Sequence, residues 1–164
     1  MLIGYVSVED ATTYVESHFI STDPLRLLWT SLTGADQEIL LRRSFESLER
    51  LPFTGRKTDP SQPNAFPRFP SNEVPNDIKA AQVENAVSLA DPATSEDAAF
   101  YQKLWQYGVE QYKIGNLSER TSSGALSNSL SAASGIVSAR ALSLVQPYIR
   151  GGFNIRGWRH EPHD

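Results

Sequence analysis

The stretch PFTGRKTDPSQPNAFPRFPSNEVP, residues 52–75, runs directly into an alanine-rich segment, NDIKAAQVENAVSLA, residues 76–90. The first of these, which we call the connector, contains six prolines: Pro52, Pro60, Pro63, Pro67, Pro70 and Pro75. Each proline fixes φ at about −65° and removes a backbone donor, so the connector can form neither a helix nor a central strand. Its phenylalanines would each contribute about 2–3 kcal/mol if buried. We therefore expect the connector to be pinned across a packed surface by Phe53, Arg56, Phe66, Pro67, Arg68 and Phe69.

Apolar residues recur at helical spacing on both sides of the connector. Ser7 and Asp10 give a capping-box signal, and Asp23-Pro24 indicates a restart with proline at the first helical position. A third helix should bury a stripe that includes Ile39, Leu40 and Leu48. The expected helices are 8–19, 24 to about 33, 36–51, 78–90 with capping from Asn76-Asp77, a stretch from 95 that holds Trp105, and 137–148.

The region after residue 106 has a different pattern. Aromatic and β-branched residues over 107–117 favour one extended strand, which needs a partner inside or outside the chain. Between Arg120 and Arg140 there is no charged residue, and residues 121–139 include seven serines. This segment is either a flexible loop or, from its apolar spacing, one helical face. The candidates for lining a channel or a contact between subunits are Lys113, Leu117, Leu126 and Leu130.

The C-terminal segment IRGGFNIRGWRHEPHD, residues 149–164, alternates apolar and polar residues beside glycines. This alternation is typical of a strand laid on another molecule, and a frayed terminus is the alternative. The candidate partner-binding residues are Arg150, Phe153, Ile155, Arg156 and Trp158. The predicted organisation is a helical domain over 1–150, with a Ser-rich insertion at 121–138, and a docking arm over 151–164. The predicted fold class is mainly α: a small helical bundle with one extended strand or hairpin, a long proline-rich connector and an extended C-terminal arm.

Composition limits the function classes. The chain has 15 basic and 19 acidic residues and a pI of about 5.4, which argues against a protein whose main task is to coat phosphate backbone. The absence of cysteine excludes disulfides, thiolate metal sites and a cysteine nucleophile. No apolar run approaches the roughly 20 residues that span a bilayer, so we expect a soluble protein without a membrane partner.

Catalytic patterns are missing as well. The segment His160 to His163 offers metal-ligating side chains, but Pro162 prevents the helix that would orient two imidazoles. Neither a Gly-x-Ser-x-Gly elbow nor a glycine-rich phosphate loop occurs. We therefore expect no enzyme, no cofactor and no metal site.

The connector also permits a nucleic-acid interpretation. Arg56, Lys57 and Arg68 lie beside Phe66 and Phe69 in the sequence, and cations with aromatic faces are what single-strand binding uses. The acidic total and the absence of a basic run longer than two residues argue against it. The alternative thus stays open as a sequence-independent module for single-stranded DNA. Arg68, between two X-Pro steps, is better placed for a bidentate contact with a carboxylate.

The same segment carries a resemblance to a known family. Its marks are Gly55-Arg56-Lys57-Thr58-Asp59-Pro60 with Gln62, then Phe66-Pro67-Arg68, and Val74-Pro75 before the helix at 78–90. In these residues the chain resembles a family of tailed-phage proteins often labelled DnaT-like single-stranded DNA-binding. The similarity covers about residues 5–150 and is strongest over 42–90.

Many members of that family resemble head-tail connector, or adaptor, proteins. The resemblance implies a homo-oligomeric ring of about twelve copies in the virion neck, made in the host cytoplasm. Its partners would be the portal protein and a tail-side neck or tail protein, and double-stranded DNA would pass through the channel without specific binding. A tail-completion ring is the other virion role that this resemblance leaves open.

Overall fold

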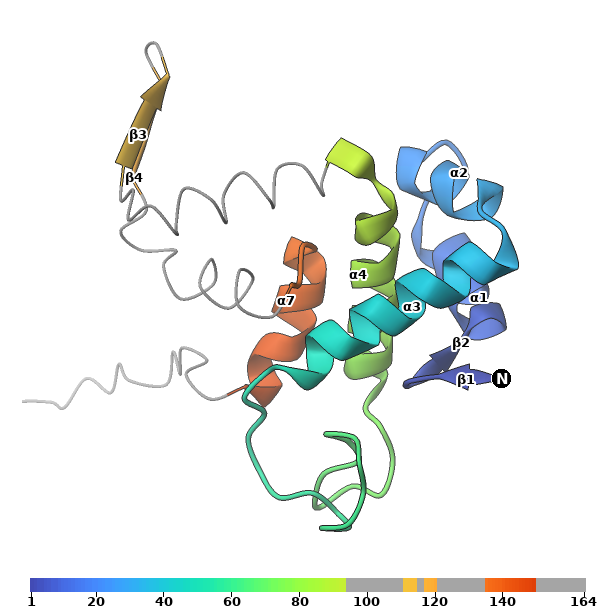
Figure 1. Ribbon diagram of the computed structural model, residues 1–164, viewed down its shortest axis with the longest axis vertical. Coiled ribbons are helices and arrows are strands. Elements are labelled where there is room, and N and C mark those ends of the chain that lie inside the picture. The colour runs from blue at the N-terminus through green and yellow to red at the C-terminus, as the bar shows by residue number, and fades with distance from the viewer. Residues whose placement is uncertain (94–110, 115–116, 121–134, 150–164) are drawn as a thin grey trace, which may run out of the picture.

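The computed structural model describes residues 1–93, 111–114, 117–120 and 135–149. These residues form five α-helices, two antiparallel hairpins and one 3-10 helix (Figure 1). The helices are α1 (Val8–His18), α2 (Pro24–Ser31), α3 (Gly34–Glu49), α4 (Asn76–Ala90) and α7 (Ala139–Val145), which continues into the 3-10 helix η1 (Gln146–Tyr148). The hairpins pair β1 (Leu2–Ile3) with β2 (Val6–Ser7), and β3 (Gln111–Ile114) with β4 (Leu117–Arg120). The predicted fold class, mainly α with a hairpin, is confirmed.

Helix α4 is the centre of the bundle. It packs against α1, α2, α3 and α7, and α7 lies on the opposite side of it from α1 and α2 (Figure 1). Ile78 and Ala81 belong to one apolar cluster with Leu48, and Val83 and Val87 belong to a second with Trp29. Because one helix serves both clusters, it is covered on most of its circumference.

Because α4 is buried, its polar side chains need hydrogen-bond partners. Both the oxygen and the nitrogen of the Gln82 side-chain amide have them. Its Oε1 accepts from Tyr5 N at 3.0 Å, while its Nε2 donates to Ile3 O at 2.7 Å and Leu41 O at 3.0 Å. Ser44 Oγ donates to the Gln82 carbonyl at 2.7 Å. One amide side chain therefore ties the N-terminal hairpin and α3 to the central helix.

Side-chain caps decide where the first three helices begin. Ser7 and Asp10 form the predicted capping box of α1, and Asp23 Oδ1 accepts from Leu25 N at 2.8 Å ahead of α2. Thr33 caps α3, which begins at Gly34, two residues before the predicted start. The expected cap from Asn76-Asp77 is wrong, because Pro75 occupies the N-cap of α4 and makes no side-chain bond.

The N-terminal hairpin was not predicted, since residues 2–6 form only a short apolar run in the sequence. Gly4 makes its turn with φ of +74°, in the left-handed region. A Cβ at this position would lie 2.4 Å from Cδ2 of Phe45. Glycine is needed here both for the turn and for the close approach of the α3 ring.

Two further expectations differ from the structure. Ile39 of α3 is exposed and not part of the apolar stripe, because the helix presents Leu40 and Leu41 to the second cluster instead. The helix expected over 137–148 is α7 followed by η1, with Pro147 in the first turn of the 3-10 helix.

The hairpin β3–β4 gives the predicted strand an internal partner. Lys113 pairs with Ser118 and Ile114 with Leu117, so the partner strand follows after only two residues. The helix expected from residue 95 and the arm at 151–164 lie outside the described residues. Among the described helices, none combines the length and apolar character needed to span a bilayer.

Candidate functional site

The connector folds back on itself as two limbs. Lys57 and Arg68 form an isolated antiparallel bridge, in which Thr58 N donates to Pro67 O at 3.2 Å and Phe69 N donates to Arg56 O at 2.9 Å. The bonds between the limbs give this proline-rich segment a defined backbone without regular secondary structure.

The turn between the limbs is built by Asp59 and Gln62. Asp59 Oδ1 accepts from both Ser61 N at 2.8 Å and Ser61 Oγ at 2.7 Å, and these bonds lower the pKa of the Asp59 carboxyl. Gln62 Nε2 donates to Asn64 O at 3.0 Å and to Pro67 O at 2.9 Å. The TDPSQ sequence thus shapes the loop and does not present a reactive group.

Phe66 fixes the connector to the core. Its ring is 3% exposed and makes edge-on contacts with Tyr5, Phe53 and Tyr148, at centroid distances of 6.0, 4.8 and 6.0 Å. Phe53 is half-buried beside it. The expected burial of the connector phenylalanines therefore holds fully for Phe66 and partly for Phe53.

The backbone next to Phe66 is bound by two side chains from other elements. Phe66 N donates to the Tyr5 hydroxyl at 3.2 Å, Ala65 N donates to Glu49 Oε2 at 2.8 Å, and the Tyr5 hydroxyl donates to Glu49 Oε1. The pKa of the Tyr5 phenol is raised well above its usual range, mainly by burial and secondly by the Glu49 carboxylate. No sequence pattern indicated that Tyr5 and Glu49 would bind the backbone of the connector.

Arg68 acts inside the connector. Its Nε donates to Thr54 O at 2.7 Å, its Nη1 to Ala65 O at 3.0 Å, and its Nη2 to Phe53 O at 3.2 Å and Gly55 O at 2.6 Å. The expected bidentate contact with a carboxylate is wrong, because four backbone carbonyls occupy the guanidinium. Arg68 therefore uses four of its five N–H donors to hold the limbs together.

Arg56 and Phe69 face the solvent instead. The Phe69 ring is 64% exposed, so its expected burial is wrong. The guanidinium carbon of Arg56 lies 5.6 Å from the ring centroid, which is a cation–π contact. Phe69 is followed in the sequence by Pro70. The guanidinium of Arg56 forms no ion pair or hydrogen bond within the described residues. We call these two residues the Arg56–Phe69 pair.

Lys57 lies next to the pair, but its ammonium is turned into the loop. Its Nζ donates to Gln62 O at 3.1 Å and to Pro63 O at 3.3 Å. No carboxylate among the described residues forms an ion pair with Lys57 or Arg68.

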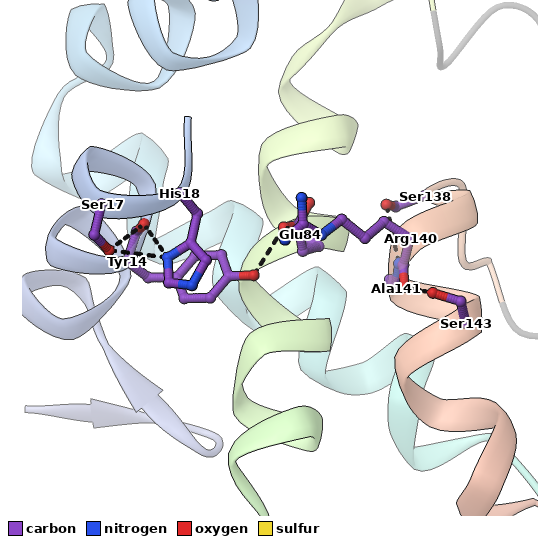
Figure 2. A network of polar contacts seen from close by, with 8 residues as sticks. All are labelled: Tyr14, Ser17, His18, Glu84, Ser138, Arg140, Ala141 and Ser143. Carbon is purple, nitrogen blue, oxygen red and sulfur yellow. Dashed lines mark hydrogen bonds and ion pairs between the residues drawn. The ribbon is translucent and has the colours of Figure 1, made fainter. Parts of the chain in front are cut away.

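A second polar network joins α1, α4 and α7 (Figure 2). Glu84 of α4, 4% exposed, accepts from the Tyr14 hydroxyl at 2.8 Å and pairs with Arg140 Nε at 3.0 Å. Burial and then Glu84 raise the pKa of Tyr14 to about 12. His18 is exposed and stacks on the Tyr14 ring, with centroids 3.9 Å apart. This network holds the three helices together.

A protein-family model covers almost the whole chain. A family model described as "Putative DnaT-like ssDNA binding protein" matches residues 4–160. The chain belongs to this DnaT-like family. No curated protein and no solved structure matches the chain.

In this member of the DnaT-like family, the remaining candidate residues are only partly placed. Lys113 lies in β3 and Leu117 in β4. The others lie outside the described residues: Leu126, Leu130, Arg150, Phe153, Ile155, Arg156 and Trp158. Within the described parts of the chain, no three His, Asp or Glu side chains gather where they could hold a metal ion.

Proposed function

We propose that this protein binds single-stranded DNA without sequence preference, and that the Arg56–Phe69 pair is a contact site. Two findings support the proposal. The chain belongs to a family whose description names that ligand, over residues 4–160. In addition, the connector exposes an aromatic ring with a guanidinium on its face. Cations that follow the phosphates and rings that stack on bases are the two components of single-strand binding.

The proposed site is smaller than the connector sequence suggests. Phe66 is buried among aromatic rings, and four of the five N–H donors of Arg68 are bound to carbonyls, so the proposed site does not include them. The formal net charge of −4 also limits long-range attraction to phosphates. We therefore expect modest affinity that falls steeply as salt is added.

A salt titration with matched variants tests this proposal. Fluorescence anisotropy would follow a labelled oligothymidylate with the full chain, R56Q and R42Q at several salt concentrations. Each phosphate contact contributes about −0.7 to the slope of log K against log salt for a single strand. R56Q should lose about that much slope.

R42Q is the control, because Arg42 is an exposed arginine on α3 and its substitution removes the same charge. It should keep the wild-type slope. If the wild type shows no salt-sensitive binding, or if both variants lose the same amount, the proposed contact site is wrong.

A second candidate function is a head-tail connector, as the resemblance to tailed-phage adaptors implies. One observation favours it: among the described residues, the β3–β4 hairpin lies apart from the helical bundle (Figure 1). A two-stranded hairpin is marginally stable by itself in water, so a surface of another copy or another protein would stabilise it. In this proposal Lys113 and Leu117 lie at a contact between subunits, and the C-terminal residues Arg150 to Trp158 dock on the portal.

Electron microscopy of the protein mixed with its portal tests the second candidate. The adaptor function predicts an added ring on the portal, and a chain that ends after Ile149 should fold but fail to join it. A protein that leaves the portal bare while it binds oligothymidylate would exclude the adaptor function and support the first proposal.

A further inference from the structure

We propose that Phe69 distinguishes single-stranded from double-stranded DNA, by stacking one unpaired base on the ring face that Arg56 covers in the free protein. This inference rests on the proposed DNA-binding function and names what the Arg56–Phe69 pair selects. The selected ligand is a strand with a free base face, of either base class, because every nucleobase has a π-face.

The ring is exposed on a fixed backbone. Phe69 N donates to Arg56 O at 2.9 Å, and Ser71 N, two residues further on, donates to Arg68 O at 3.0 Å. The opposite limb is held at Gly55, whose carbonyl accepts from Arg68 Nη2 at 2.6 Å. A base that stacks on Phe69 therefore meets a side chain whose backbone is already fixed, and little backbone entropy is lost on binding.

A comparison with the second phenylalanine–arginine pair shows why this ring can exchange its partner. Arg68 lies over Phe66 at 5.9 Å, a distance close to the 5.6 Å of the Arg56–Phe69 pair. However, Phe66 is 3% exposed, and the guanidinium of Arg68 is bound to carbonyls. Arg56 has no such bonds within the described residues, so it can leave its ring without leaving a buried donor unpaired.

The two side chains of the pair then have different effects on specificity. A guanidinium released from the ring can bind the phosphate next to the stacked base, and phosphates are present in single and double strands alike. A base in a duplex is covered on both faces, and its extrusion costs a few kcal/mol. Arg56 should therefore raise affinity for both forms, whereas Phe69 should raise affinity for the single strand only.

The test measures the full chain and its variants against three ligands of equal length: an oligothymidylate, an abasic strand and a duplex. F69L should bind the oligothymidylate at least about 5-fold more weakly and should bind the duplex as the wild type does. The wild type should bind the abasic strand about as weakly as F69L binds the oligothymidylate. F69L should bind the abasic strand and the oligothymidylate with equal affinity. F69W keeps an aromatic face and should keep single-strand preference, while R56Q should weaken binding to oligothymidylate and duplex together.

The outcomes separate the inference from the proposed function. If the wild type binds oligothymidylate in a salt-sensitive way and F69L binds it equally well, the stacking role of Phe69 is excluded and DNA binding stands. If the wild type binds none of the three ligands, both are excluded. Since the ring is exposed, F69L should unfold at the wild-type temperature, and circular dichroism would confirm that a change in binding does not come from unfolding.

Discussion

The hydroxyl of Tyr5 donates a hydrogen bond to the carboxylate of Glu49, and together these two residues bind the backbone of the connector. Tyr5 lies between β1 and β2, Glu49 is the last residue of α3, and both contact the segment Ala65-Phe66. A proline-rich segment with few backbone donors is thus fixed by side chains from distant elements. The position of the Arg56–Phe69 pair depends on this arrangement.

The substitution Y5F should destabilise the protein by about 1–3 kcal/mol, because Glu49 Oε1 loses its donor and Phe66 N its acceptor in a buried setting. Urea unfolding measures the difference. Y148F is the matched control, since the Tyr148 hydroxyl binds the exposed Asp77 at 3.1 Å and should contribute less than about 1 kcal/mol. Equal effects of the two substitutions would contradict the role assigned to Tyr5.

Replacing Arg68 with lysine should loosen the connector although the charge is kept. An ammonium cannot reach the four carbonyls that the planar guanidinium binds, so we expect a loss of about 1–3 kcal/mol. Amide hydrogen exchange at Thr58 and Phe69 should become faster. R56K, at the exposed arginine, should change stability by less than about 0.5 kcal/mol, and a larger loss from R56K than from R68K would overturn this assignment.

High pH should weaken the contact between α1 and α4. The pKa of Tyr14 is raised from 10.0 to about 12, so the folded state holds this proton more tightly than the unfolded chain does. The corresponding stabilisation is complete below pH 10 and is lost as the pH rises to about 12, where a phenolate would face Glu84. Thermal unfolding between pH 9 and 12 would show it as a steeper loss for the wild type than for Y14F. Parallel pH profiles would contradict it.

Gly4 and Gly34 should respond in opposite ways to alanine. At Gly4 a methyl group meets the Phe45 ring and the φ of +74° is strained, so G4A should cost at least about 2 kcal/mol. At Gly34 no atom lies within 4 Å of the added Cβ, and G34A in the first turn of α3 should be neutral or stabilising by up to about 1 kcal/mol. Calorimetry of the two variants measures both, and a tolerated G4A would show that the N-terminal turn can rearrange.

Local signals in the sequence were sufficient for the first three helices. Ser7, Asp23 and the apolar spacing of α3 act within a few residues, and the structure keeps them with shifts of about two residues at the ends. The proline pattern likewise predicted a connector without regular structure. These predictions succeed because capping and proline geometry do not depend on distant parts of the chain.

The polar contacts that hold the site could not be predicted in the same way. Gln82 binds Ile3, 79 residues away, and Tyr5 binds Phe66, 61 residues away, and neither pair has a periodicity or a motif. The roles of Phe69 and Arg68 also differ from those expected, because residue type does not show which of two phenylalanine–arginine pairs faces the solvent. Only the fold of the two limbs decides this.

The most direct test of the central claim is a set of backbone NMR spectra of the full chain with and without oligothymidylate. The claim that the connector contacts single-stranded DNA predicts that amide shifts concentrate between Gly55 and Ser71, with Arg56 and Phe69 among the largest. The amides of α1 and α2 should stay in place. Unchanged spectra at saturating oligonucleotide, or shifts that avoid the connector, would contradict the account.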